Sequence, residues 1–411
     1  MALTNTKQAK ELAAYYSKMR GDSPLTFNAI EGKEGDRLTY VAKIQFAELA
    51  QHFDIVPTDK APKGVMLQRE LAASRGRNIA KYIKNNDDFI FPSLIAVVEK
   101  IELTKLSITD IVKATLPAAS FRYFVDGQGR LFGIKDVLKA LPELGNQCVD
   151  VKFVLSRGVE ADAQIFTDVN KTPTSPNASQ CIAMDSRKVM STFAKDAVLT
   201  NEHLRSRIDF TKKSVTASSD SPYLWTLNQY SKFLQMLTGT TSTTAEKLFA
   251  DPEQRNQWIA FTNKFFEKLQ VNAFIENSIS LGRGEWTRNS IVPTSVFLKS
   301  LALFGKVILL NFASRGDETP DWSFMDKLSD VVFSTINPEW SGRCLNYRGR
   351  FEDKTFNHRA MASYLCMVTG LEVPEELETV EEEVLRARAD ILKLKREANK
   401  AQTALPLEED V

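Results

Sequence analysis

Cysteine and histidine, from which most zinc sites and catalytic imidazole sites are built, are scarce in this sequence. The four cysteines are Cys148, Cys181, Cys344 and Cys366. None stands at metal-ligand spacing from another, which argues against a zinc ribbon and predicts free thiols in a reducing cytoplasm. The three histidines, His52, His203 and His358, lie in separate contexts. The sequence therefore argues against a Ser-His-Asp triad and against a metal site built from histidines.

No charge of one sign dominates the chain, and no long apolar run is uninterrupted. The formal net charge is +1, so binding to nucleic acid or to a membrane surface would have to come from a local patch. The most apolar stretch, from Val296 to Phe312, contains Lys299 and Lys306, and we expect no membrane span. The N-terminus carries no apolar signal core. We therefore expect a cytoplasmic protein of two or three domains.

The pattern of apolar residues changes near residue 185. Before this point, aromatic-rich and alternating runs predict strands mixed with short helices. After it, strand signals nearly vanish and helical spacing dominates. The sequence predicts an α+β fold with a mixed sheet-helix domain at residues 1–185, a mainly α-helical domain at 186–372, and a long helix with an acidic tail at 373–411.

The C-terminal segment has apolar residues at alternating spacings of three and four. They are Leu377, Val380, Val384, Ala387, Ile391, Leu394, Ala398, Ala401 and Leu405. This spacing is a heptad seam and predicts a long amphipathic helix. The helix could pair with a second copy, which would make residues 377–405 a homo-oligomer contact. It could equally enter a groove on another subunit or pack back on its own domain.

Residues 120–135 combine a strand, a polar turn and a helix start. Phe121 to Val125 reads as a strand, and the pentapeptide from Asp126 to Arg130 reads as a compact turn with two glycines. The unpaired amides at the start of the following helix suit an anion. The glycines let a phosphate approach the backbone, and an arginine can grip it. The alternative is a tight structural connection in which Asp126 caps the helix.

A second polar cluster follows the helix predicted at residues 159–166. Asp168 and Asn170 could both coordinate Mg²⁺ through oxygen, and Lys171 could reach a phosphate. Alternatively, these are the turn residues of a helix C-terminus. If both turns lie at one edge of a sheet, Arg130, Asp168, Asn170 and Lys171 would converge on a shared cleft.

The densest basic cluster of the N-terminal half lies on a predicted helix near residue 77. Its members are Arg69, Arg75, Arg77 and Lys81. They are either a solvated helix face or a set of contacts to phosphates of nucleic acid.

Several motifs around the turn follow the order seen in one family. Together with the pentapeptide, they resemble the DGQHR-domain family, which includes the DndB proteins of DNA phosphorothioation systems and the DndB-like DpdB proteins of 7-deazaguanine DNA modification. The segments are 44–50, 67–71, 78–83, 91–96 and 165–171. The sequence departs from the family at Gly129, where histidine is usual, so any mechanism that needs an imidazole there is in doubt.

The resemblance places the N-terminal domain with the ParB and sulfiredoxin superfamily and implies a site for ATP or another nucleotide with Mg²⁺. Carried over residue by residue, it implies catalytic roles for Asp126, Gln128, Arg130 and Asp168. It likewise implies nucleotide contacts by Gly127, Gly129, Arg130, Asn170 and Lys171, and metal ligation by Asp168 and Asn170. Phosphoryl transfer needs mainly positioning and charge neutralisation, which such residues can supply.

Three hypotheses follow from the resemblance and the residues. In the first, the chain is an ATPase that supports the modification enzyme of a bacterial DNA-modification system. In the second, it is a DNA-binding repressor of the modification operon, with Arg69, Arg75, Arg77 and Lys81 contacting DNA. In the third, it is an assembly subunit whose C-terminal helix binds a modification enzyme subunit from the same operon. The first and third are compatible, and we favour them together.

Overall fold

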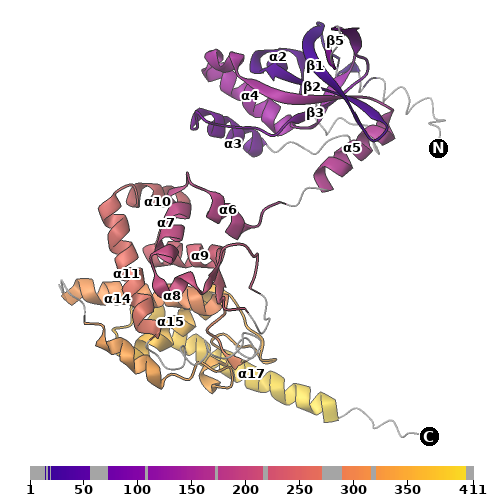
Figure 1. Cartoon of the computed structure of the whole chain (residues 1–411). Coiled ribbons are helices and arrows are strands. Elements are labelled where there is room, and N and C mark those ends of the chain that lie inside the picture. The colour runs from indigo at the N-terminus through magenta and orange to yellow at the C-terminus, as the bar shows by residue number, and fades with distance from the viewer. Residues whose placement is uncertain are drawn as a thin grey trace, which may run out of the picture. The chain divides into compact units, whose positions relative to one another are not determined.

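The computed structural model describes residues 14, 17, 18, 20–55, 73–106, 110–171, 175–215, 221–270, 289–315 and 321–403 (Figure 1). The chain divides into two compact units, Met1–Thr174 and Ser175–Val411. The first unit ends before the expected boundary at residue 185, and the expected terminal segment 373–411 belongs to the second unit. The α+β class is confirmed, since a sheet with helices is followed by helical structure.

A seven-stranded sheet organises the first unit, with strand order β4-β5-β1-β2-β7-β3-β6. Its strands are β1 (Leu25–Glu34), β2 (Arg37–Gln45), β3 (Leu94–Val98), β4 (Glu102–Lys105), β5 (Ile111–Leu116), β6 (Arg122–Asp126) and β7 (Cys148–Leu155). Neighbouring strands are antiparallel except β3 and β7, which are parallel. Strands β1 and β2 form a hairpin, and Gly35 at its turn has a φ of 60°. Strand β6 ends the sheet, so the turn after it lies at an edge.

Helices cover both faces of this sheet. They are α2 (Phe46–His52), α3 (Ala73–Lys84), α4 (Gln128–Ala140) and α5 (Val159–Lys171), with a 3₁₀ turn at Pro142–Asn146. Side chains alternate along β6, so Phe124 packs with Leu131 of α4, whereas Tyr123 and Val125 pack with Phe166 of α5. Helices α4 and α5 therefore lie on opposite faces of the strand that carries the predicted site.

Two glycines allow α3 to approach α4 closely. A Cβ on Gly76 would lie 2.1 Å from Cδ1 of Phe132, and a Cβ on Gly133 would lie 2.5 Å from Cγ2 of Ile79. Larger residues at either position would push the helices apart. This packing holds the basic helix α3 beside the helix that starts at the predicted turn.

Within its described residues, the second unit is helical apart from the short pair β8 (Ile208–Asp209) and β9 (Trp225–Thr226). Its helices are α6 (Ala178–Met184), α7 (Val189–Leu199), α8 (Glu202–Arg205), α9 (Leu227–Thr238), α10 (Ser242–Leu248), α11 (Pro252–Gln270), α14 (Ser295–Arg315), α15 (Thr355–Thr369), α16 (Glu375–Glu378) and α17 (Val380–Thr403). The 3₁₀ helices are η3 (Ser323–Asp330) and η4 (Pro338–Trp340). Residues 324–335 thus contain a short 3₁₀ helix and no α-helix.

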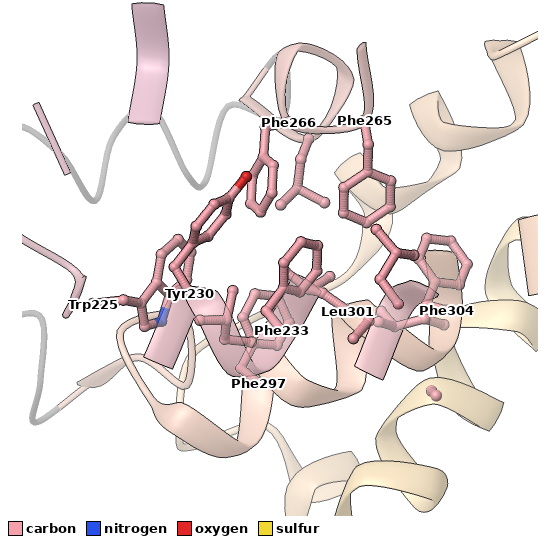
Figure 2. Packing of buried hydrophobic residues seen from close by; sticks show 14 of the residues in the cluster. Trp225, Tyr230, Phe233, Phe265, Phe266, Phe297, Leu301 and Phe304 are labelled. Carbon is pink, nitrogen blue, oxygen red and sulfur yellow. The ribbon is translucent and has the colours of Figure 1, made fainter. Parts of the chain in front are cut away.

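Aromatic side chains fill the core of the second unit (Figure 2). Phe233 of α9 meets Phe266 of α11 edge-on at a centroid distance of 5.4 Å, and Phe297 and Phe304 of α14 belong to the same cluster. Within the described residues, the stretch Ser295–Ala313 of α14 is long and apolar enough to cross a membrane, but 67% of it is buried inside the unit. Its contacts are those of a core helix.

The C-terminal heptad seam divides into two parts. Val380 and Val384 are buried against Phe356 and Ala360, and Ile391 is 9% exposed. Beyond Ile391 the side chains described are exposed. The first half of α17 therefore packs back on its own unit, and only the second half is free to pair with another protein.

Candidate functional site

The turn between β6 and α4 has a backbone that requires glycine. Gly127 has a φ of 112°, and a Cβ there would lie 2.3 Å from Cδ2 of Leu94. Gly127 occupies the N-cap position of α4, and among the described residues no side chain caps this helix. The capping role considered for Asp126 is wrong, because its carboxylate faces Arg130 instead. The first-turn amides of α4 lack acceptors within the helix.

Arg130 is bound within the unit. Its Nη2 donates to Oδ2 of Asp126 at 2.5 Å, and its Nη1 donates to the carbonyls of Pro92 at 2.5 Å and Ser93 at 3.3 Å. The side chain is 14% exposed. These bonds tie the start of β3 to the first turn of α4. To grip a phosphate, the guanidinium would have to share or leave these partners.

Gln128 presents an unmatched donor beside the same helix start. Its Nε2 is buried and has no hydrogen-bond partner among the residues that the structure describes. A buried amide without an acceptor is unfavourable, since it has lost its water without a replacement. The helix start therefore carries a side-chain donor as well as backbone donors.

Asp168 and Asn170 lie on α5 and not in a loop, because this helix continues through Lys171. Residues that are two apart on an α-helix point in directions about 200° apart, so the side chains of Asp168 and Asn170 lie on opposite sides of α5. Asp168 accepts from Gln164 at 2.5 Å, and Asn170 donates to the carbonyl of Phe166 at 2.8 Å. The structure thus does not bring the two together as a pair of ligands for one ion. Their separate roles stay predictions.

The expected cleft also depends on side chains from both turns. Asp126 and Arg130 belong to the α4 face of β6, and α5 packs on the other face. The side chain of Lys171 lies outside the described part of the chain. Among the described residues, no group of three or more histidine, cysteine, aspartate or glutamate residues is placed to hold a metal ion.

The basic cluster lies on the exposed side of α3. Arg75, Arg77 and Lys81 are exposed, while Arg69 lies outside the described residues. Helix α3 also ends on Lys84 and contains no acidic residue. Its charge is therefore not neutralised from within the helix.

Arg122 is a buried polar side chain on β6, the strand that leads to this site, and was not among the predicted site residues. It is 1% exposed, its Nη2 donates to the carbonyl of Ser23 at 2.9 Å, and within the described residues its Nε and Nη1 have no partner. Burial lowers the pKa of His52, and the positive charge of Arg122 lowers it further. The signal in the sequence was an arginine within an otherwise apolar strand.

Comparison with known protein families gives a match that spans parts of both units. A family model named DndB, described as DNA-sulfur modification-associated, matches residues 27–372. This chain belongs to the DndB family. The match includes the β6–α4 turn, α3, α5 and most of the second unit, and ends before α17. No curated protein and no solved structure matches the chain. Of the two modifications that the motif order implied, membership in the DndB family indicates sulfur modification.

Proposed function

We propose that this DndB-family protein binds ATP at the start of α4 and hydrolyses it in support of a DNA-sulfur modification enzyme. The observation that carries the proposal is the uncapped N-terminus of α4. It follows Gly127, whose positive φ and packing against Leu94 fix the direction of the helix start, and lies beside the unmatched amide of Gln128. Backbone amides at a helix start, helped by the helix dipole, bind phosphate in many nucleotide sites.

Arg130 has two roles in this proposal. Without nucleotide it holds Asp126 and the start of β3. With nucleotide, one of its nitrogens turns to a phosphate oxygen, because a phosphate and a carboxylate compete for the same planar group. This exchange couples nucleotide binding to the β3 edge.

Mg²⁺ would arrive with the nucleotide. Because Mg²⁺ usually keeps several waters and binds protein through one or two carboxylates, the phosphates of ATP would supply most of its ligands. Asp168, Asn170 and Lys171 of α5 stay predicted contacts of this ion and of the phosphates, but the proposal does not depend on them, because α5 packs on the other face of β6. Gly129 widens access at the helix start, and no step relies on an imidazole.

The test measures binding and hydrolysis of ATP with Mg²⁺ by the full chain. Gln128→Ala is the key variant, because its amide nitrogen has no partner to lose in the fold. We expect it to weaken ATP binding about tenfold, the effect of one hydrogen bond to a charged group. Lys139→Ala, at the exposed far end of α4, is the matched control and should bind as wild type. Wild-type protein that neither binds nor hydrolyses ATP would refute the proposal.

DNA binding through α3 is the second candidate function, that of an operon repressor. The supporting observation is a helix with four basic residues and no acidic residue, and all four, Arg75, Arg77, Lys81 and Lys84, are exposed. A mobility shift on operon promoter DNA, compared between wild type and the Arg75→Ala/Arg77→Ala/Lys81→Ala variant, tests it. A wild-type protein that leaves the DNA unshifted at low salt would end this candidate.

The partner we propose for the second half of α17 is a modification enzyme subunit from the same operon, with a second copy of this chain as the competing occupant. Leu392 and Leu394 are exposed there, beside Lys393, Lys395 and Arg396. Deleting residues 392–411 should abolish co-purification with that subunit. Measuring the mass of the intact chain in solution then separates the two occupants.

A further inference from the structure

A tight hairpin projects from the second unit between η4 and α15. We call residues 346–351, with the sequence Asn-Tyr-Arg-Gly-Arg-Phe, the arginine tip. Leu345 pairs with Phe351 as an antiparallel bridge, and the amide of Asn346 donates to the carbonyl of Arg350 at 3.0 Å. Gly349 has a φ of 69°, which lets the chain reverse within the tip.

A single side chain sets the conformation of the tip. Oδ1 of Asn346 accepts from the amide of Arg348 at 3.0 Å and from the amide of Arg350 at 3.1 Å. The carbonyl of Asn346 accepts from the amide of Gly349 at 2.9 Å. The backbone amides of both arginines are therefore held by hydrogen bonds to the side chain of one asparagine.

Charged hydrogen bonds to neighbouring helices fix the two ends of the hairpin. On one side, Arg343 donates to both carboxylate oxygens of Glu381 on α17. On the other side, Asp353 accepts from Lys299 of α14 at 2.8 Å and from His358 of α15 at 2.5 Å. The base of the tip is thus anchored to three helices, and the tip is presented in a fixed position.

The charge of the tip is not neutralised within the described part of the chain. Arg348 and Arg350 are exposed, and neither forms an ion pair there, while Arg348 lies over the ring of Tyr347 at 5.1 Å. The neighbouring acids have other partners: Glu352 faces Lys354 at 3.5 Å, and Asp353 holds Lys299 and His358. Two guanidinium groups therefore remain available on a rigid support.

We propose that the arginine tip binds duplex DNA through the phosphates of its backbone. Guanidinium groups bind phosphate with two parallel hydrogen bonds, and a preformed loop loses little conformational entropy on binding. An interface for a folded protein would need an apolar centre, but the exposed apolar surface here amounts to part of Phe351, which is 37% exposed. Tyr347 adds a ring that holds Arg348 against the support.

The test is the affinity of the full chain for an unmodified duplex DNA across a range of salt concentrations. Each phosphate contact contributes about 0.9 to the slope of log affinity against log salt. We expect Arg348→Ala/Arg350→Ala to lower affinity at least about tenfold and to reduce the slope by about two. Arg386→Ala is the matched control, since this exposed arginine of the same unit pairs with Glu382, and it should bind as wild type.

A second variant separates position from charge. Asn346→Ala keeps both arginines but removes the acceptor that orders them, and we expect weaker binding than wild type with Trp fluorescence of the native fold retained. Wild-type protein without affinity for duplex DNA at low salt would overturn the proposal, as would a double alanine variant with unchanged affinity and slope. ATP binding by the double variant should equal that of wild type, so failure here is distinct from failure of the nucleotide site.

Discussion

Two buried arginines, one in each unit, have contrasting surroundings. Arg343 is 2% exposed, and its guanidinium binds both carboxylate oxygens of Glu381 at 2.6 and 2.5 Å and the carbonyl of Ala360 at 2.7 Å. Arg122 is as deeply buried but has one hydrogen bond, to the carbonyl of Ser23. The second unit neutralises its buried cation, whereas in the first unit two guanidinium nitrogens have no partner among the described residues.

The difference separates two uses of a buried charge. Arg343 joins α17 to the segment before α15, so it stabilises one arrangement of distant parts of the chain. A buried pair is costly to break, because the remaining partner keeps its desolvation penalty. Arg122 has no such counter-charge in hydrogen-bond contact, and burial lowers its pKa while the charge of Asp22 opposes this. The contrast predicts opposite responses to the same substitution.

Arg343→Met should have the largest effect. It leaves Glu381 half-buried without its partner, and we expect the second unit to lose about 3 kcal/mol of stability. All five tryptophans of the chain lie after residue 174, so Trp fluorescence during urea unfolding reports on this unit alone. Arg386→Met is the control, because it removes an exposed ion pair with Glu382 on α17, the helix that carries Glu381. It should cost under about 0.5 kcal/mol of stability. Equal losses in the two variants would show that Arg343 is not an anchor.

Arg122→Met should have a smaller effect of the opposite sign. Replacing an unmatched buried charge by an apolar side chain of similar length should leave the first unit unchanged or stabilise it by about 1 kcal/mol. Hydrogen exchange in peptides that cover β3 and β6 measures this without tryptophan, and slower exchange is expected. Lys113→Met, an exposed change on β5, is the control. Faster exchange in Arg122→Met would show that the guanidinium has a stabilising partner that its hydrogen bonds do not reveal.

The strand, the turn and the start of α4 were predictable because their causes are local. The run from Phe121 to Val125, which is apolar except for Arg122, and a glycine at position 127 specify a strand that ends in a turn, and the structure has both. The hydrogen-bond partners of Arg130 could not be predicted, because Pro92 and Ser93 precede β3 and lie 38 and 37 residues away in the sequence.

Two further misses have physical causes. Helix α5 extends through Asp168 and Asn170 because nothing before Pro173 stops it, whereas the two polar residues alone indicated a turn. Helix α15 mixes polar and apolar residues, yet Asn357 and His358 are buried in it through bonds to Arg343 and Asp353. Such polar contacts between a helix and the segment before it cannot be read from the spacing of apolar residues, and they anchor the arginine tip.

The stability of the second unit should also depend on pH, with a smaller and more gradual change than the one expected for Arg343→Met. Burial lowers the pKa of His358 from its usual 6.5, although its bond to Asp353 opposes this. A depressed histidine pKa means that the unfolded chain takes up a proton first, so stability should fall as the pH drops below about 6.5. Trp-monitored urea midpoints between pH 7.5 and 5 measure this, and His358→Asn should flatten the curve in that window.

A second loss should follow at lower pH. Burial raises the pKa of Glu381, but its hydrogen bonds and attraction to Arg343 outweigh burial, so its pKa lies below the usual 4.5. The stability from this carboxylate is present above pH 4.5 and is lost as the pH falls through the lowered value. In Arg343→Met this second loss should vanish while the first remains. Loss of both together would mean that one group controls the whole profile.

Removing the free half of α17 should have the smallest effect on stability. Leu392 is 58% exposed and Leu394 is 42% exposed, so deleting residues 392–411 removes little buried surface. We expect the free energy of unfolding of the second unit, measured by urea, to change by less than about 0.5 kcal/mol. Deletion from residue 380 is the contrasting variant, because it removes Val380, Val384 and the partner of Arg343 together. If the shorter deletion destabilised the unit as much as the longer one, the free half would be part of the core and not a surface for a partner.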